Sequence, residues 1–273
     1  QIHHEVQFQI DVYKGQSIMS SHGDEIYYFD PHNEQVVCTN IDFTQITFTY
    51  QISDVNLVKC IQDYLFLATK SQLLIFVKND LKKQIPILNE PTSVELIDNK
   101  LYLFQKYSAI LTSFDSDFNL SSQITIPSAL LLVQNFLLTK NSLINLCSNK
   151  ETPLRIQGTP TAAVFHEDNL LVSTTQRQLL LLTKDCKVIK SIQHVAKDLV
   201  LYILALKNEI FVISEANEVI KVDFEAQKQQ KTQQITQVKQ DYYNALFKAD
   251  GLMLGVCGND KNRLGLTDSY WYV

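Results

Sequence analysis

The chain has 273 residues, of which 45% are hydrophobic and 19% are charged, and this composition excludes global disorder. Its formal net charge of -5 excludes a generally basic nucleic-acid binder, so nucleic acid would bind only through a local basic patch. No apolar run approaches the ~18–20 residues that span a bilayer, and we expect no membrane insertion. The five cysteines are scattered, which favours reduced thiols in an intracellular protein without distinguishing cytoplasm from nucleus.

A hairpin signal recurs along the chain: a short polar turn, usually with Asp or Asn, leads into a run of strand-forming residues. Examples are Asp98-Asn99 before Leu101–Phe104 and Asp168-Asn169 before Leu170–Val172. The strands after these turns begin at residues 64, 101, 136, 170, 210 and 252, which gives spacings of 37, 35, 34, 40 and 42 residues. All-β units that repeat with this period predict the blades of a β-propeller.

Each repeat divides into short strands. The unit at 92–128 predicts strands at 92–97, 101–105, 109–114 and 122–127. Carried to both ends of the chain, the period predicts seven units, with approximate bounds 1–54, 55–91, 92–128, 129–160, 161–198, 199–240 and 241–273. The predicted fold class is therefore all-β: a seven-bladed β-propeller of four-stranded antiparallel blades, forming a single domain over residues 1–273.

The two ends of the chain leave two arrangements open. Residues Glu5–Val12 alternate strictly between apolar and polar, which predicts a half-buried strand. Either this strand opens the first blade, with 46–50 as an extended outer strand or insertion, or it joins the last blade. The turn positions favour the first arrangement. For the segments 40–53 and 227–240, an outer strand and an insertion that binds a partner both stay open.

An apolar residue precedes Asp near the places where third strands are expected to end: Phe29-Asp30, Phe114-Asp115 and Val222-Asp223. Over nearly the whole chain, this arrangement resembles the WD40-like seven-bladed β-propeller superfamily. The resemblance implies a mostly non-catalytic platform that holds protein partners in a multiprotein assembly.

Catalytic signatures are absent from the sequence, which contains no nucleophile elbow, metalloprotease motif or phosphate loop. The titratable residues on the clearer first strands are Lys59, Glu95 and His166, and they come from three different blades. No two Cys or His residues show the spacing of zinc ligands. We therefore expect no enzymatic activity, no catalytic residue, no cofactor and no metal.

The turns between second and third strands carry a recurring cation, and in a propeller these turns share one face. The candidate partner-binding residues are His22, Lys70, Lys106, Tyr107, Lys140, Arg177 and Lys261. One interpretation is that exposed turns are simply polar. The other is a cationic rim that receives an acidic peptide, a phosphorylated segment or a nucleic-acid backbone.

The sequence thus predicts a non-catalytic protein-interaction scaffold, a subunit of a larger intracellular complex whose partners are other protein subunits. The alternative is a binding module for phosphate-bearing or acidic polymers, which would bind through the basic rim on one propeller face.

Overall fold

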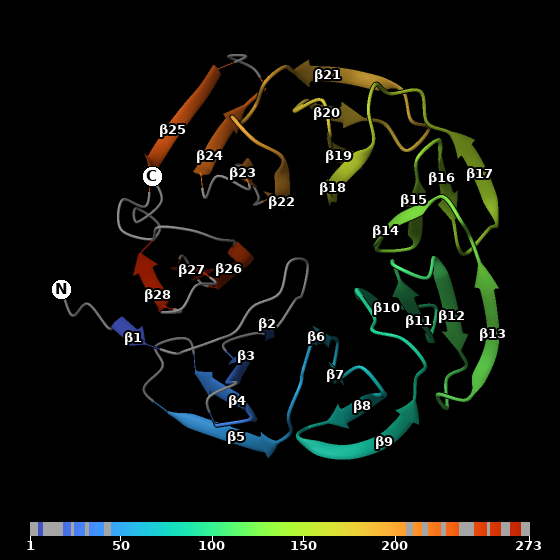
Figure 1. The fold of residues 1–273 in the computed structure, drawn as a ribbon, viewed down its shortest axis with the longest axis vertical. Coiled ribbons are helices and arrows are strands. Elements are labelled where there is room, and N and C mark those ends of the chain that lie inside the picture. Colours follow the sequence, from blue (N-terminus) through green and yellow to red (C-terminus); the bar gives the residue numbers. More distant parts are fainter. Residues whose placement is uncertain are drawn as a thin grey trace.

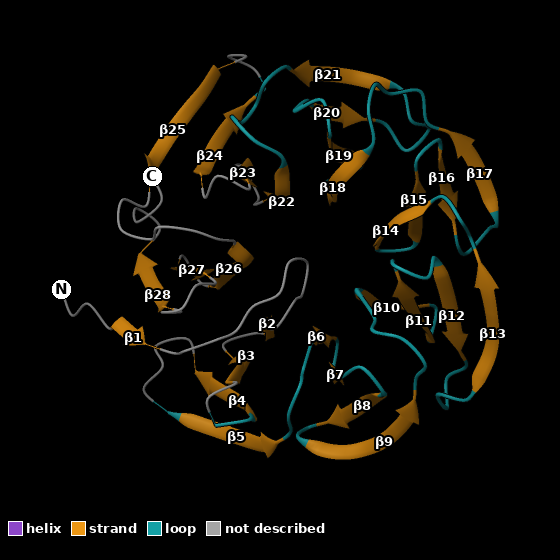
Figure 2. Ribbon diagram, in the orientation of Figure 1, coloured by secondary structure: helices purple, strands orange, loops and turns teal. Residues whose placement is uncertain are grey.

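The computed structural model describes residues 5–7, 19–22, 25–30, 33–40, 45–205, 210–214, 218–224, 228–234, 243–249, 252–257 and 263–268. Within these residues the chain forms strands and turns, and none of them lies in an α-helix (Figure 2). It follows that no helix in the described part is long and apolar enough to cross a membrane. The described strands form seven four-stranded antiparallel sheets. An all-β chain of four-stranded antiparallel units is therefore confirmed.

The first four sheets in chain order each consist of four consecutive strands. The first contains β2 (Met19–His22), β3 (Glu25–Asp30), β4 (Gln35–Asn40) and β5 (Ile46–Gln51). The second contains β6 (Leu57–Ile61), β7 (Tyr64–Ala68), β8 (Gln72–Val77) and β9 (Asp80–Pro86). The third contains β10 (Ser93–Ile97), β11 (Lys100–Gln105), β12 (Ile110–Phe114) and β13 (Leu120–Thr125). The fourth contains β14 (Ala129–Val133), β15 (Phe136–Thr139), β16 (Ser142–Asn145) and β17 (Lys150–Pro153).

The next two sheets repeat this plan, and the last one differs. The fifth contains β18 (Pro160–His166), β19 (Asn169–Thr174), β20 (Leu179–Leu182) and β21 (Val188–Ile192). The sixth contains β22 (Val200–Ala205), β23 (Ile210–Ser214), β24 (Glu218–Asp223) and β25 (Lys228–Gln234). The last contains β26 (Tyr243–Ala249), β27 (Leu252–Cys257), β28 (Arg263–Asp268) and, from the other end of the sequence, β1 (Glu5–Gln7).

The pairing of β1 with β28 corrects the arrangement that the turn positions favoured. Glu5 lies opposite Gly265 and Gln7 opposite Arg263, so the first strand belongs to the last sheet and not to a unit at 1–54. The fourth strand of the first sheet is β5, as one of the interpretations of residues 46–50 expected. Phe29-Asp30 accordingly ends a second strand and not a third. The alternation at residues 5–12 predicts a half-buried strand but carries no information about its partner.

The recurring polar turns are hairpin turns between the first and second strands of a sheet. Ile97 pairs with Lys100, so only Asp98 and Asn99 lie in the turn, and their φ angles are 48° and 60°. Two left-handed residues in a two-residue turn match the right-handed twist of the flanking strands. The prediction that these polar turns connect paired strands is therefore confirmed.

The core lies between neighbouring sheets. In the first five sheets the second and third strands are largely buried, as the pattern of Leu179–Leu182 shows. Phe66, Phe76 and Phe104 are among the largest fully buried side chains. The outer strands of the same five sheets are largely exposed, and β13 is exposed at every residue. A strand buried on both faces reads as a continuous apolar run, which explains the four consecutive leucines.

The sheets are set around a common centre, with the first strand of each one innermost (Figure 1). Each innermost strand contacts the innermost strand of the next sheet, and β26 contacts β2. Because each sheet is an antiparallel meander, its turns alternate between two faces. We call the face with the first-to-second and third-to-fourth turns the hairpin face. The face with the second-to-third turns and the connections between sheets is the connector face.

Candidate functional site

Four of the predicted cations lie on the connector face, each in the turn between the second and third strands of its sheet. They are Lys70, Lys106, Lys140 and Arg177. The first three side chains are exposed, and none of them forms an ion pair with a described residue. Arg177 is half-buried, and its Nη1 donates a hydrogen bond to the Lys197 carbonyl at 3.0 Å. The connector face therefore presents three exposed lysines that no described carboxylate pairs with.

A threonine at the end of the second strand shapes several of these turns. The Thr69 hydroxyl oxygen accepts hydrogen bonds from the backbone N–H groups of Ser71 at 3.3 Å and Gln72 at 3.2 Å. Thr139 does the same for Asn141 at 3.1 Å and Ser142 at 2.8 Å. The hydroxyl satisfies two backbone donors of the turn, and the residue after the threonine is exposed. In both turns that residue is a lysine.

Two of the predicted residues stand apart from this set. His22 ends the innermost strand β2 and pairs with Glu25 across the first hairpin, so it lies on the hairpin face. Its assignment to the cationic turns was wrong because it rested on counting β1 as the first strand of the first sheet. Lys261 lies outside the described residues. Tyr107 follows Lys106 on the connector face, and its side chain is 79% exposed.

The connections between sheets add residues that the sequence interpretation missed. Within residues 45–205, the connector face holds six Lys or Arg residues and three carboxylates: Lys70, Lys106, Lys140, Arg155, Arg177 and Lys197 against Asp54, Glu90 and Asp198. Arg155 and Lys197 are exposed. They follow the fourth strands β17 and β21, whereas the sequence prediction rested on the turns after second strands. The polar connections after fourth strands are the signal in the sequence that points to them.

The hairpin face has the opposite balance. In the same stretch of chain its turns hold three lysines and seven carboxylates: Lys78, Lys184 and Lys187 against Asp63, Asp98, Asp115, Asp117, Glu167, Asp168 and Asp185. Lys184 is engaged by Asp168 at 2.7 Å. Residues 45–205 therefore give a positive connector face and a negative hairpin face.

A surface pocket lies beside Lys70, between the first and second sheets. Its volume is about 330 Å³, and residues 50–54, 69–72, 74 and 84 line it. Asp54 lies in its wall together with Lys70. Polar groups dominate this lining, so the pocket resembles a wet groove between two sheets more than an apolar ligand cavity.

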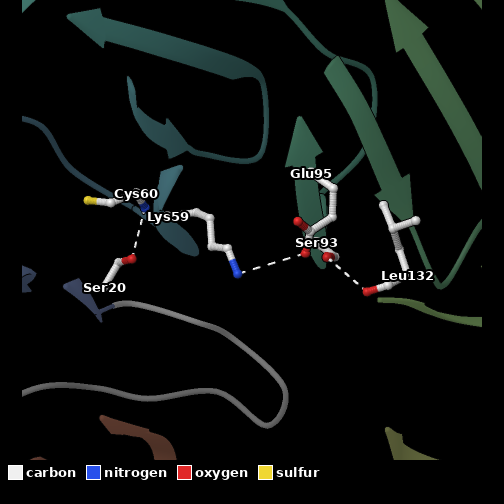
Figure 3. A network of polar contacts seen from close by, with 6 residues as sticks. All are labelled: Ser20, Lys59, Cys60, Ser93, Glu95 and Leu132. Carbon is white, nitrogen blue, oxygen red and sulfur yellow. Dashed lines mark hydrogen bonds and ion pairs between the residues drawn. The ribbon is translucent and has the colours of Figure 1, made fainter. Parts of the chain in front are cut away.

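A second group of polar residues connects the innermost strands (Figure 3). Lys59 of β6 and Glu95 of β10 point toward one another, with Nζ and Oε1 3.8 Å apart. Burial raises the pKa of Glu95, opposed by the nearby Lys59 ammonium and by a hydrogen bond from the Gln134 backbone N–H. The Glu95 side chain is 18% exposed and that of Lys59 is 40% exposed. The two titratable residues that the sequence assigned to separate blades are thus brought together.

The neighbouring contacts give these polar groups a structural role. The Ser20 hydroxyl oxygen accepts the Cys60 backbone N–H at 2.8 Å, and the Ser93 hydroxyl donates to the Leu132 carbonyl at 3.5 Å. Each contact satisfies an edge group of the next innermost strand, which has no strand partner on that side. His166 ends β18 and makes no contact with Lys59 or Glu95 among the described interactions. In the described residues, no group of three or more His, Cys, Asp or Glu residues is placed to hold a metal.

Four-stranded antiparallel sheets set around a centre, each beginning at its innermost strand, define a β-propeller. No family model matches the sequence, and no curated protein matches it significantly. The fold is similar to a WD40 propeller chain in the crystal structure of the mitotic checkpoint complex. That chain has 10% identity and a TM-score of 0.79, with 98% of this chain and 91% of that chain covered. At this identity the likeness shows the fold alone, and it supports the propeller fold that the resemblance to the WD40-like superfamily implied.

Two enzymes have a similar fold. A streptogramin B lyase structure has 13% identity and a TM-score of 0.71, with 97% of both chains covered. A catalytically inactive histidine-to-alanine variant of virginiamycin B lyase from Staphylococcus aureus, with quinupristin, has 12% identity and a TM-score of 0.74. The alignment covers 97% of this chain and 99% of the lyase chain. The propeller fold is thus found both in an assembly subunit and in lyases, so the function must be argued from the site.

Proposed function

We propose that the chain is a seven-bladed β-propeller, one domain in extent, that acts as a non-catalytic interaction platform in an intracellular protein complex. The contacts between successive innermost strands, including β26 with β2, support the closed ring. The checkpoint-complex chain with a similar fold supports a role in an assembly.

The observation that carries the proposal is the charge of the connector face. Lys70, Lys106 and Lys140 are exposed on three successive sheets, and none of them forms an ion pair with a described residue. Cations held apart on a rigid ring attract a complementary acidic surface and accelerate its association. The proposed partner is therefore an acidic protein surface that docks on the connector face.

Charge reversal tests this proposal. A Lys70→Glu, Lys106→Glu, Lys140→Glu variant should bind poly-glutamate at least ~10-fold more weakly than the parent protein, and binding by the parent should fall with added salt. The matched control reverses Lys78, Lys100 and Lys187, which are exposed at the hairpin ends of their strands. Both variants change the net charge from -5 to -11, so equal losses would show that total charge and not the connector face governs binding.

A binding module for phosphate-bearing polymers is the second candidate, because the exposed ammonium groups of Lys70, Lys106 and Lys140 also match phosphate groups. A phosphopeptide and single-stranded nucleic acid should be measured beside poly-glutamate. Tighter, salt-sensitive binding of either one, lost in the connector-face variant alone, would favour this second function.

The lyase structures define the test of the non-catalytic part of the proposal. We expect quinupristin to remain intact after prolonged incubation with the purified protein, as measured by mass spectrometry. Turnover that depends on protein concentration would contradict a purely non-catalytic role.

A further inference from the structure

The two most exposed large hydrophobic side chains in the described part of the chain lie on the connector face. Leu88 is 86% exposed and Tyr107 is 79% exposed. Leu88 belongs to the connection between the second and third sheets, and Tyr107 to the β11–β12 turn of the third sheet. Single exposed apolar residues are ordinary on protein surfaces, so what matters here is that these two share a face and a neighbourhood.

Hydrogen bonds hold the connection that carries Leu88 from both sides. The backbone N–H of Ile87 donates to the Ser71 carbonyl at 2.9 Å, and Ser71 directly follows Lys70. The Gln105 side-chain Nε2 donates to the Asn89 carbonyl at 2.6 Å, and Gln105 directly precedes Lys106. Leu88 therefore lies between the turn that bears Lys70 and the turn that bears Lys106 and Tyr107.

Further contacts hold this connection in place in the absence of a partner. The Thr92 N–H donates to the Phe104 carbonyl at 2.9 Å and closes the connection onto β11. Pro91, in the same connection, is buried, and its ring fixes the backbone φ angle. A surface that is ordered in advance loses little conformational entropy on binding, which raises the affinity available from a small contact area.

Resting on the proposed function, we propose that Lys70, Leu88, Lys106 and Tyr107 form a docking site for a short acidic segment of a partner protein that carries one bulky apolar side chain. The apolar side chain packs on Leu88 and Tyr107, and carboxylates on either side of it pair with Lys70 and Lys106. The choice of partner follows from charge complementarity: the apolar pair is flanked by cations that form no ion pair with a described residue. An aromatic anchor framed by polar contacts is the usual composition of a binding hot spot.

The test uses the full chain and an array of acidic peptides that differ only in their central residue. We expect binding to the peptides with a central Leu, Ile, Phe, Trp or Met, and at least ~10-fold weaker binding to those with Gly, Ser or Asp. The Leu88→Ser and Tyr107→Ser variants should each lower affinity for the best peptide by about 10-fold or more. Leu120→Ser is the matched control, because Leu120 is 65% exposed on the outer strand β13.

The outcomes separate this inference from the proposal on which it rests. If the Lys70, Lys106 and Lys140 reversal abolishes peptide binding while Leu88→Ser and Tyr107→Ser leave it unchanged, the acidic partner stands and the apolar anchor is wrong. If peptides bind regardless of their central residue, the anchor is also wrong. Absence of binding to every peptide overturns the docking site, and tighter binding of single-stranded nucleic acid through the same four residues assigns the surface to another class of ligand.

Discussion

Many tight turns of this chain are made without glycine. The chain has only seven glycines, and residues such as Gln62, Lys78 and Gln134 adopt left-handed backbone conformations with φ angles of 54°, 48° and 52°. For a residue with a Cβ this conformation costs roughly 1–2 kcal/mol. The paired strands on either side hold these residues in place, so the turns carry backbone strain that the register of the sheets maintains.

Replacement of Gln62 by glycine should relieve this strain. We expect Gln62→Gly to raise the free energy of unfolding by up to about 1 kcal/mol, since the relief exceeds the greater chain entropy of glycine in the unfolded state. Urea denaturation measures the change. Asp63→Gly is the control: Asp63 lies in the same turn without a positive φ, so this substitution should lower stability. An equal effect of both substitutions would contradict the strain argument.

The residue scale also shows how far the site could be predicted from the sequence. Lys70, Lys106 and Lys140 were identified because their turns lie between recognisable strands. Leu88 was missed, since an apolar residue next to a strand reads as part of it, and only the folded connection exposes it. His22 was placed on the wrong face because its location depends on which strand opens the first sheet. That choice is made by a pairing between distant parts of the chain.

At the scale of elements, contacts between innermost strands join one sheet to the next. Ser20 of β2 accepts from the β6 backbone, Lys59 of β6 pairs with Glu95 of β10, and Ser93 of β10 donates to the β14 backbone. Ser20 and Ser93 each satisfy a backbone group at an edge that has no neighbouring strand, and Lys59 and Glu95 join two innermost strands through their side chains. The polar residues near the centre of the ring are thus used to fasten sheets together.

The Glu95 carboxyl makes this fastening dependent on pH. Burial raises the pKa of Glu95 in the folded protein. Below the ordinary pKa of 4.5 the carboxyl is protonated in both the folded and the unfolded protein, so its ionisation does not lower the free energy of unfolding. As pH rises, the unfolded chain loses this proton first, and the contribution of Glu95 to stability falls until pH passes the raised value. Glu95→Gln resembles the protonated form. We expect its free energy of unfolding, relative to the parent protein, to improve from pH 4.5 toward neutrality.

Removal of the cation provides the control for this prediction. Lys59 lowers the pKa of Glu95 against the larger effect of burial. Lys59→Met should therefore raise that pKa further and extend the fall in stability to higher pH, measured by urea denaturation across the pH range. A difference between Glu95→Gln and the parent protein that stays constant from pH 4 to pH 7 would contradict the assignment.

The strands themselves were largely predictable, whereas one pairing was not. Hairpins between sequence neighbours follow from local apolar runs and turn residues, and the strands at 64–68, 101–105 and 170–174 fall where the sequence expects them. The partner of β1 depends on contacts between residues more than two hundred positions apart. Local periodicity carries no information on such a contact, which explains why both arrangements of the ends stayed open.

At the scale of the whole molecule, β1 supplies the outer strand of the last sheet. Deletion of residues 1–7 should remove its ladder with β28 and lower the free energy of unfolding by about 1–3 kcal/mol, the net value of a few hydrogen bonds. Deletion of residues 1–4 keeps β1 and is the control. Denaturant unfolding of the two deletion proteins checks the prediction, and equal stability would show that β1 contributes nothing to the fold.

The opposite charges of the two faces over residues 45–205 give this part of the molecule a preferred orientation toward a charged partner. An acidic partner would approach the connector face and be repelled from the hairpin face, so the field selects the docking side before contact. This selection weakens as salt shortens the screening length to about 8 Å at physiological ionic strength.

The β1–β28 ladder also sets the order of events during synthesis. Glu5 and Gly265 are separated by 260 positions, so β1 leaves the ribosome long before its partner exists. At ~5–20 residues per second, this interval is roughly 10–50 s. Throughout it, the newborn chain carries a strand without a partner and an unclosed row of sheets. The segment that carries β28 thus completes the last sheet, and a translational pause before residue 263 would prolong the period in which nascent chains are open to mispairing with one another.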